Sequence, residues 1–348
     1  GAPGRPASPV PPAAADAAAV SGPPMIGSAP ASTSLAPEQF AERWGARGYL
    51  TPLDGPVHWI EFGAPGPGSS GPPLLFVHGL GGSHLNFCQV GPQLAAGRRA
   101  VALDLHGFGL TPGTRRTSTV RANVRLLDRF VREVCGTPVI LAGNSMGGMI
   151  SVLQAAAAPD TVAGLVLIDP ALPVPRRGLD PLVASQFLLY ALPGVGELVV
   201  RTMLMRRTPE VAVRQLIELN FADPSRADPA MVAASVELAR RRMGDPAQAR
   251  AYGQSLLAAS RSLLRVNGRP RRYWEMMASV KVPVLLIGGE SDRLVPLASM
   301  RAAAARNPRW ETVFLPGVGH TPQLEVPDAV IGAVSGWLGT LEERTCSN

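Results

Sequence analysis

The stretch VILAGNSMGGMIS, residues 139–151, places Ser145 between Gly143 and Gly147, where an apolar run gives way to an alanine-rich one. The first run is typical of a buried strand and the second of a helix. A sharp turn between them would hold the serine clear of the sheet in a strained backbone conformation, which requires small neighbours. We interpret Ser145 as a candidate nucleophile; the alternative at this point is a serine that only caps the helix.

The composition is that of a globular protein. Hydrophobic residues make up 46% of the 348 residues and charged residues 17%, which suffices for the core of one large domain or of two ordinary ones. The net charge of +7 arises between residues 171 and 275, in amphipathic segments with little aromatic interleaving and no nucleic-acid-binding motif. We expect no nucleic-acid partner, and solvated helix faces are favoured over a patch for acidic lipids or acidic substrates.

Signals for targeting or cross-linking are absent from the sequence. The three cysteines are far apart and match no metal or redox spacing, which fits a reducing compartment. No window of 18 uninterrupted apolar residues occurs, and the first residues lack the pattern of a secretory signal. We expect a cytoplasmic protein without stable membrane insertion. Residues 1–35 are rich in Ala and Pro and have hardly any large apolar side chain, which predicts a disordered tail.

Apolar runs and helical segments alternate along the chain, which is typical of a mainly parallel sheet flanked by helices. The predicted strands are residues 57–62, 74–79, 99–107, 137–144, 163–170, 282–289 and 312–318. The alternation stops between residues 171 and 279, where the periodicity is helical. This predicts an α/β core of residues 36–170 and 280–345, with a helical cap of residues 171–279 inserted into it.

A serine hydroxyl needs a base that removes its proton. Of the five histidines, His320 follows the last predicted strand in a glycine-rich loop, at the sheet edge where Ser145 is expected. The base in turn needs a carboxylate, and Asp292 follows the preceding strand; Glu290 and Asp169 are its rivals. The favoured catalytic triad is therefore Ser145, His320 and Asp292.

An oxyanion formed at an attacked carbonyl needs N–H donors. The backbone N–H of Met146 lies at the predicted helix start, where such donors have no helical partner. The glycines of HGLGG, residues 78–82, allow the loop after an earlier strand to bring the N–H of Leu80 to the same point. Leu80 and Met146 are the candidate oxyanion hole; the alternative for HGLGG taken alone is a tight turn.

With these parts in place, the sequence resembles the α/β-hydrolase superfamily, and within it the lidded serine esterases and lipases. The resemblance rests on HGLGG, DLHGFGLT, GNSMGG, LIDPA, GGESDRLVP and GVGHTPQLEVP, in the family's order. It implies a mostly parallel eight-stranded sheet flanked by helices, with a helical cap inserted after strand 6. It also implies the triad and the oxyanion hole named above, and neither a metal nor an organic cofactor.

Residue types separate the branches of this superfamily. Haloalkane dehalogenases and epoxide hydrolases need an aspartate where this chain has Ser145. Carbon–carbon bond hydrolases of ring-cleavage products typically have Gly-Pro-Gly in the oxyanion loop and Trp after the histidine, whereas this chain has Gly81-Gly82-Ser83 and Thr321. The favoured function is a serine hydrolase for esters with a short or medium acyl chain. A carbon–carbon hydrolase and a non-catalytic small-molecule-binding homologue are the alternatives.

The predicted cap should select the small-molecule ester substrate. Phe187, Leu188, Met203 and Leu204 are apolar enough to line an acyl pocket, and methionine suits a pocket that adapts its shape. The alternative is that these side chains only pack the cap against the sheet. The sequence assigns no role to two further histidines, His84 and His106.

Overall fold

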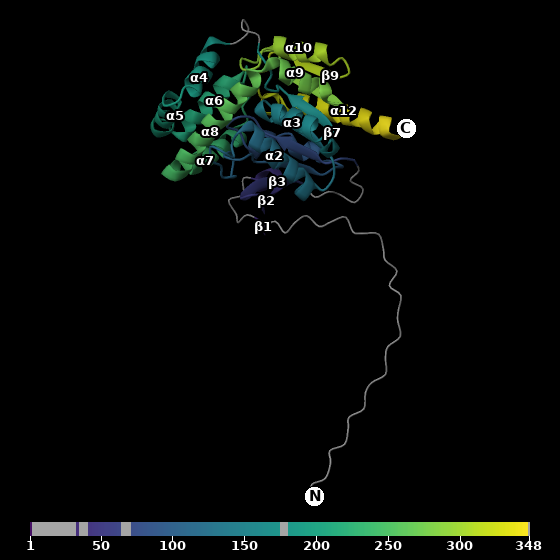
Figure 1. The fold of residues 1–348 in the computed structure, drawn as a ribbon, viewed down its shortest axis with the longest axis horizontal. Coiled ribbons are helices and arrows are strands. Elements are labelled where there is room, and N and C mark those ends of the chain that lie inside the picture. The colour runs from purple at the N-terminus through teal and green to yellow at the C-terminus, as the bar shows by residue number, and fades with distance from the viewer. Residues whose placement is uncertain (2–32, 35–40, 64–70, 175–179, 347–348) are drawn as a thin grey trace.

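The computed structural model describes residue 1 and residues 33–34, 41–63, 71–174 and 180–346. Over these residues the chain forms a nine-stranded sheet with helices on both faces (Figure 1). The strands are β1 Thr33–Ser34, β2 Ala46–Pro52, β3 Pro56–Phe62, β4 Leu74–Val77, β5 Ala100–Leu103, β6 Val139–Asn144, β7 Val162–Ile168, β8 Val284–Gly289 and β9 Glu311–Leu315. Their order in the sheet is β1-β2-β3-β5-β4-β6-β7-β8-β9.

The strands from β4 to β9 are parallel to one another, whereas β1, β2 and β3 pair in antiparallel fashion. Strands β2 to β9 are the mostly parallel eight-stranded sheet that the resemblance implied. Because parallel strands end at the same edge, the segments that follow β4, β6, β7, β8 and β9 meet there. This edge is where the candidate residues were expected.

Two strands on the antiparallel side of the sheet, β1 and β2, were not found from apolar runs. Strand β2 has only Ala46 and Thr51 buried, so its sequence lacks a run of apolar residues. Strand β1 pairs with β2 and falls within the predicted tail. The rest of that tail, residues 2–32 and residue 35, lies outside the described residues.

Two apolar clusters cover the two faces of the sheet. Alternate side chains of β4 show the division, because Leu75 and Val77 join one cluster and Leu74 and Phe76 the other. The first cluster includes side chains of α2 Val120–Phe130, α3 Met146–Ala157, α9 Pro270–Ser279 and α10 Leu297–Arg306, and the second those of α1 Gly91–Leu94 and α12 Pro327–Cys346. The shorter helices are the 3-10 helices Glu42–Trp44, His84–Phe87, Pro159–Thr161 and Pro224–Arg226, the π-helix Val131–Cys135 and the α-helix α11 Pro322–Glu325.

The described part of the segment between β7 and β8 is helical. Helices α4 Pro181–Ala191, α5 Val195–Arg206, α6 Pro209–Asn220, α7 Pro229–Gly244 and α8 Pro246–Asn267 lie to one side of the sheet (Figure 1). Four of them start at an Asp-Pro or Thr-Pro pair, where Asp180, Thr208, Asp228 and Asp245 accept hydrogen bonds from N–H groups of the first turn. The chain therefore encodes where these helices begin.

The last helix of the insertion, α9, packs against α3 through the buried side chains of Tyr273 and Met277. It therefore covers the sheet, unlike α4 to α8. The residue limits expected for tail, core and cap stay predictions. Among the described residues, no single helix is both long and apolar enough to cross a lipid bilayer.

Replacement of Gly147 by Ala tests how closely α3 approaches the sheet. A Cβ at Gly147 would lie 2.0 Å from the carbonyl oxygen of Val77, so we expect the free energy of unfolding to fall by about 3 kcal/mol. Gly332→Ala in α12 is the matched control, because a Cβ there meets no atom within 4 Å. Urea unfolding would show a control that is unchanged or up to about 1 kcal/mol more stable. Equal stabilities for the two variants would contradict the close approach.

Candidate active site

Ser145 occupies the sharp turn between β6 and α3. Its backbone angles, φ 54° and ψ −119°, are far from those of ordinary strands and helices. The flanking glycines are required by space, because a Cβ at Gly143 would lie 2.6 Å from the backbone of Gly147. Gly79 in the neighbouring loop has little room as well, since its Cβ would lie 3.1 Å from Cβ of Ser145. The predicted strand-to-helix turn is confirmed in its geometry.

Hydrogen bonds hold this turn in its strained conformation. The N–H of Ser145 donates to the carbonyl oxygen of Ile168 (3.0 Å), and the N–H of Ala171 donates to the carbonyl oxygen of Ser145 (2.8 Å). The side-chain amide of Asn144 donates to the carbonyl oxygens of Ile168 and of His320, each at 3.1 Å. Asn144, to which the sequence assigned no role, thus connects the serine turn to the histidine loop.

His320 and Asp292 form a buried pair. Nδ1 of His320 lies 2.7 Å from Oδ2 of Asp292, and the other carboxylate oxygen accepts the N–H groups of Leu294 (2.7 Å) and Val295 (3.0 Å). With Nδ1 bound to the carboxylate, Nε2 is the ring nitrogen left for other chemistry. Ser145 and His320 line the same cavity. The structure therefore brings the three predicted residues to one place.

The two rivals of Asp292 occupy different surroundings. Glu290 is exposed and lies 3.8 Å from Arg301. Asp169 is fully buried, is hydrogen-bonded to Asp292 and accepts the N–H of Gly289 at 3.0 Å. Burial, together with the charge of Asp292, raises the pKa of Asp169 well above its usual value, which favours the protonated acid. Asp169 is thus suited to donate a hydrogen bond to Asp292.

The cap holds the histidine loop directly. The N–H of His320 donates to the carbonyl oxygen of Asn220, at the end of α6, over 2.6 Å. The buried carboxyl group of Glu325 accepts the N–H groups of Gly319 (2.8 Å), Ala222 (3.1 Å) and Asp223 (2.9 Å). One side chain therefore joins the histidine loop to the segment between α6 and α7. The motif GHTPQLEVP contains Glu325, but nothing in the sequence indicates what the carboxyl group contacts.

Buried polar groups also fix the loop of the candidate oxyanion hole. Nε2 of His78 accepts the N–H of Leu105 at 3.0 Å, so Nδ1 carries the proton and donates to the carbonyl oxygen of Gly79 at 2.8 Å. Burial lowers the pKa of His78 to about 4, which keeps the imidazole neutral for both contacts. Leu80, the next residue but one, lines the cavity beside Ser145.

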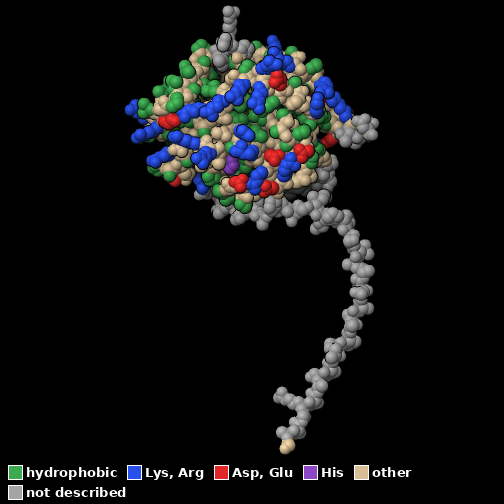
Figure 2. All heavy atoms as spheres, in the orientation of Figure 1, with side chains coloured by type: hydrophobic (Ala, Val, Ile, Leu, Met, Phe, Trp, Pro, Cys, Tyr) green, Lys and Arg blue, Asp and Glu red, His purple; other side chains and the backbone are tan. Residues whose placement is uncertain are grey.

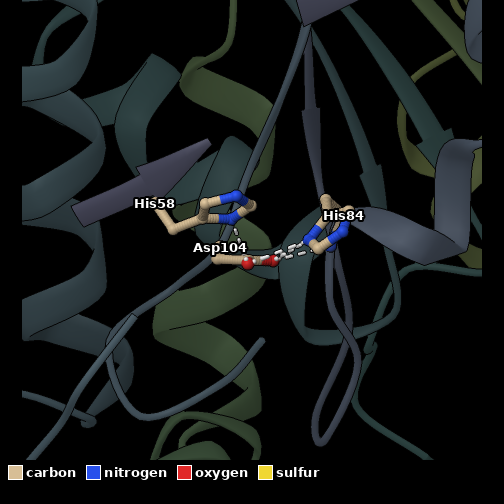
Figure 3. A group of neighbouring side chains, drawn as sticks. All are labelled: His58, His84 and Asp104. Carbon is tan, nitrogen blue, oxygen red and sulfur yellow. Dashed lines mark hydrogen bonds and ion pairs between the residues drawn. The ribbon is translucent and has the colours of Figure 1, made fainter. Parts of the chain in front are cut away.

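Asp104 lies between the imidazoles of His58 and His84 (Figure 3). Its Oδ2 is 2.7 Å from Nδ1 of His58 and 2.9 Å from Nδ1 of His84, and it also accepts the N–H of Leu110. Burial alone would raise the pKa of Asp104, but the two imidazoles outweigh it and hold the pKa well below its usual value. Because the facing ring nitrogens are at hydrogen-bond distance, a cation there would have to displace their protons. The contact with Asp104 therefore fixes His84 at the end of the loop that contains Leu80. The other histidine without an assigned role, His106, donates its backbone N–H to Oδ1 of Asn123 at 2.9 Å.

A cavity of about 1190 Å³ extends from Ser145 and His320 into the helices α4 to α8. Its wall is mainly apolar and includes three of the four side chains expected in an acyl pocket, Phe187, Met203 and Leu204. Met146 is buried in the core and is not part of this wall. Only the backbone N–H of Met146, at the first position of α3, could contribute to the site.

The prediction for Leu188 is wrong. Its side chain is 62% exposed and does not line the cavity. On helix α4, Phe187 and Tyr190 face the cavity. Ala184, Leu188 and Ala191 are spaced four and three residues apart, so they share one face of the helix, and none of them lines the cavity. Apolar residues occur all around α4, so its sequence does not reveal which face is inside.

The raised pKa of Asp169 makes a prediction about stability. The folded protein retains a proton on Asp169 that the unfolded chain releases above its usual pKa of 3.8, so stability falls as pH rises from 3.8 through the raised value. Asp169→Asn removes this loss while keeping an acceptor for Gly289 and a donor for Asp292. Urea unfolding should give a higher free energy of unfolding than wild type at pH 8, about 1.4 kcal/mol for each unit of raised pKa, and no gain near pH 3.8.

The matched control for this measurement is Asp160→Asn. Asp160 is exposed, and its hydrogen bond with Arg132 lowers its pKa, so its replacement should give no gain at high pH. A loss of stability in Asp169→Asn at pH 8 would show that the acid is ionised in the folded protein.

Glu325→Gln tests the connection between cap and histidine loop. The amide cannot accept at both positions, so we expect His320 to lose its placement and Ser145 to react about 10- to 100-fold more slowly with a fluorophosphonate. Labelling rates, with thermal unfolding as a check on folding, measure this effect. Glu290→Gln is the control, since its carboxyl group faces Arg301 and should leave the rate near that of wild type. An unchanged rate in Glu325→Gln would exclude a positioning role.

Comparison with known proteins shows to which family the chain belongs. The model of the alpha/beta hydrolase family matches residues 74–333. The chain is 28% identical over 274 residues to the dihydrolipoyllysine-residue acetyltransferase component of the acetoin cleaving system of Pseudomonas putida, a match that covers 79% of this chain but only 64% of that longer relative. It is 29% identical over 273 residues to the pimeloyl-[acyl-carrier protein] methyl ester esterase of Xanthomonas axonopodis pv. citri (strain 306), covering 78% of this chain and 96% of that enzyme.

Among solved structures, the haloalkane dehalogenase DatA from Agrobacterium tumefaciens C58 superposes with a TM-score of 0.71 at 20% identity, covering 87% of this chain and 99% of that one. A likeness at this identity concerns the fold. The family match spans both sides of the insertion and includes the segments that contain Ser145, Asp292 and His320. The chain belongs to the α/β-hydrolase family.

Proposed function

We propose that the protein is a serine hydrolase that cleaves carboxylic esters through an acyl-enzyme. The observation that supports this most is the 2.7 Å contact between His320 and Asp292, which leaves Nε2 of the histidine available in the cavity that Ser145 also lines. The esterase among the relatives is consistent with this activity.

In the proposed mechanism, Oγ of Ser145 attacks the ester carbonyl carbon while Nε2 of His320 takes its proton. Asp292 holds Nδ1–H and stabilises the imidazolium. The N–H groups of Leu80 and Met146 bind the oxyanion, and one such donor typically contributes about 3 to 4 kcal/mol to the transition state. His320 then protonates the departing alcohol, and water activated by the same nitrogen releases the acid and restores the serine.

The size and lining of the cavity support an acyl substrate. Its volume of about 1190 Å³ is above the range of about 300 to 1,000 Å³ that is usual for small-molecule sites, and its walls are mainly apolar. A medium acyl chain along Phe187, Met203 and Leu204 fits this wall better than a short one. The proposed cap, residues 171–279, would then determine chain length.

Two other functions stay as alternatives. A carbon–carbon bond hydrolase would use the same serine, but the chain has Thr321 after the histidine in place of the tryptophan typical of that branch. A non-catalytic binding protein would not need a buried carboxylate on the histidine. Dehalogenation of the kind named in the structural relative would need a carboxylate nucleophile, and Ser145 supplies a hydroxyl.

Ser145→Ala is the decisive variant. Turnover of p-nitrophenyl esters should fall at least about 10⁴-fold, because the nucleophile is lost while the fold is retained. Wild type should prefer medium over short acyl chains and should not cleave a ring-cleavage dienone. Ser279→Ala, at the exposed end of α9, is the control and should retain full turnover. Dienone cleavage without ester cleavage would establish the carbon–carbon hydrolase, and full turnover in Ser145→Ala would refute the scheme.

A further inference from the structure

The outer side of the cap exposes an unusual number of apolar side chains. Among the described residues, all of the strongly exposed large hydrophobic ones fall between residues 182 and 216. They are Leu182, Leu188, Leu189, Leu192, Val195, Leu198, Met205 and Leu216, which we name the cap patch. Concentration of exposed apolar residues on one part of a surface indicates a site of contact with another apolar body.

The shape of the cap patch suits a surface better than a span. Helices α4 and α5, of 11 and 12 residues, meet at an angle of 111°. Each is about 16 to 18 Å long, which is well short of the roughly 30 Å of a bilayer core. Together the two helices have the length and composition of a broken span, but their sharp bend suits apolar sides that lie in the plane of a lipid surface.

The charges beside the cap patch are positive and available. Arg201, Arg206 and Arg207 are exposed on α5 and after it, and no acidic partner is found for them in the described part of the chain. The four acidic side chains between residues 180 and 218 already have basic partners, which are other than these three arginines: Asp180 pairs with Arg293 (2.9 Å), Glu197 with Arg261 (2.8 Å), Glu210 with Arg240 (2.9 Å) and Glu218 with Arg214 (3.8 Å). Figure 2 shows basic side chains projecting from this side of the molecule. The patch therefore combines aliphatic surface with unpaired positive charge.

The cap patch is continuous with the cavity of the candidate active site. Leu182, Leu189, Leu198 and Leu216 belong both to the exposed set and to the cavity wall. Arg206 and Arg207 line the cavity as well. An ester that entered through the patch would pass from an apolar, positively charged surface directly into the apolar interior.

Three occupants of the cap patch can be compared. A second copy of the chain, in a symmetric contact, would bring together two patches that both have unpaired positive charge, which is unfavourable. A protein partner is usually bound by buried aromatic side chains, and the exposed set is entirely aliphatic. An anionic lipid surface matches both components, because it accepts leucine side chains and attracts arginine.

We propose that the cap patch docks the protein on an anionic lipid surface, with the cavity mouth facing the lipid. Docking itself does not depend on hydrolysis, whereas delivery of a lipid-like ester from that surface to Ser145 rests on the proposed function. The interaction is peripheral and salt-dependent, since part of it is the attraction of the arginines to lipid phosphates.

Sedimentation with vesicles tests the docking. The full chain should bind vesicles that contain phosphatidylglycerol at low salt, and should bind less to phosphatidylcholine vesicles and at high salt. Leu192→Glu with Met205→Glu should weaken binding at least about tenfold, since two apolar contacts are replaced by negative charges. Neither residue lines the cavity, so turnover of a soluble ester should stay at the wild-type level.

Matched controls separate docking from charge and from catalysis. Arg201→Glu should weaken binding at least about fivefold, whereas Arg309→Glu, the same charge change between α10 and β9, should not. Ser145→Ala should bind vesicles like wild type, so a failure of the proposed function leaves the docking result intact. Absence of binding to phosphatidylglycerol vesicles, or equal binding by the double variant, overturns the proposal. If wild type is a dimer, the double variant is a monomer and neither binds vesicles, then the occupant of the cap patch is a second copy of the chain. This result also overturns the proposal of lipid docking.

Discussion

The close approach of α3 to the end of β4 is the constraint on which the site depends. Only a residue without a side chain lets the backbone of Gly147 lie against the carbonyl of Val77, and a milder crowding exists at Gly79 beside Ser145. If α3 moved outward by the width of a methyl group, the serine would leave the loop of Leu80. The strained turn, the loop that faces it and the start of the helix are thus one packed unit.

Buried carboxyl groups then connect this unit to the rest of the chain. Asp104 accepts hydrogen bonds from two imidazoles and from backbone N–H groups. Asp292 accepts hydrogen bonds from one imidazole and two backbone N–H groups. Glu325 is held by backbone N–H groups of two segments about a hundred residues apart in the sequence. Each carboxyl group is expensive to bury without partners, so each makes the arrangement around it specific.

Local patterns were enough for the central elements of the fold and for the main candidates at the site. The parallel strands are continuous apolar runs, and the turn at Ser145 is marked by its glycines, so both can be predicted from neighbouring residues. Strand β2 is half exposed and leaves no such run. The outward position of Leu188 and the contacts of Glu325 depend on how distant segments meet, which no local pattern encodes. The three residues of the proposed triad are an intermediate case, because the order of the strands is enough to place them at one edge of the sheet.

The hydrogen bond from His320 to the carbonyl of Asn220 has a consequence for motion. If the cap moved away as a rigid body at the end of α6, this hydrogen bond would displace the backbone of His320. The hydrogen bonds of Glu325 to the segment between α6 and α7 would displace the histidine loop in the same way. Opening would then displace His320 from Ser145, and closure would bring the two residues together again. The cavity would then be open to solvent only while His320 is displaced from Ser145. Water that entered an empty cavity would therefore find the proposed nucleophile without its general base.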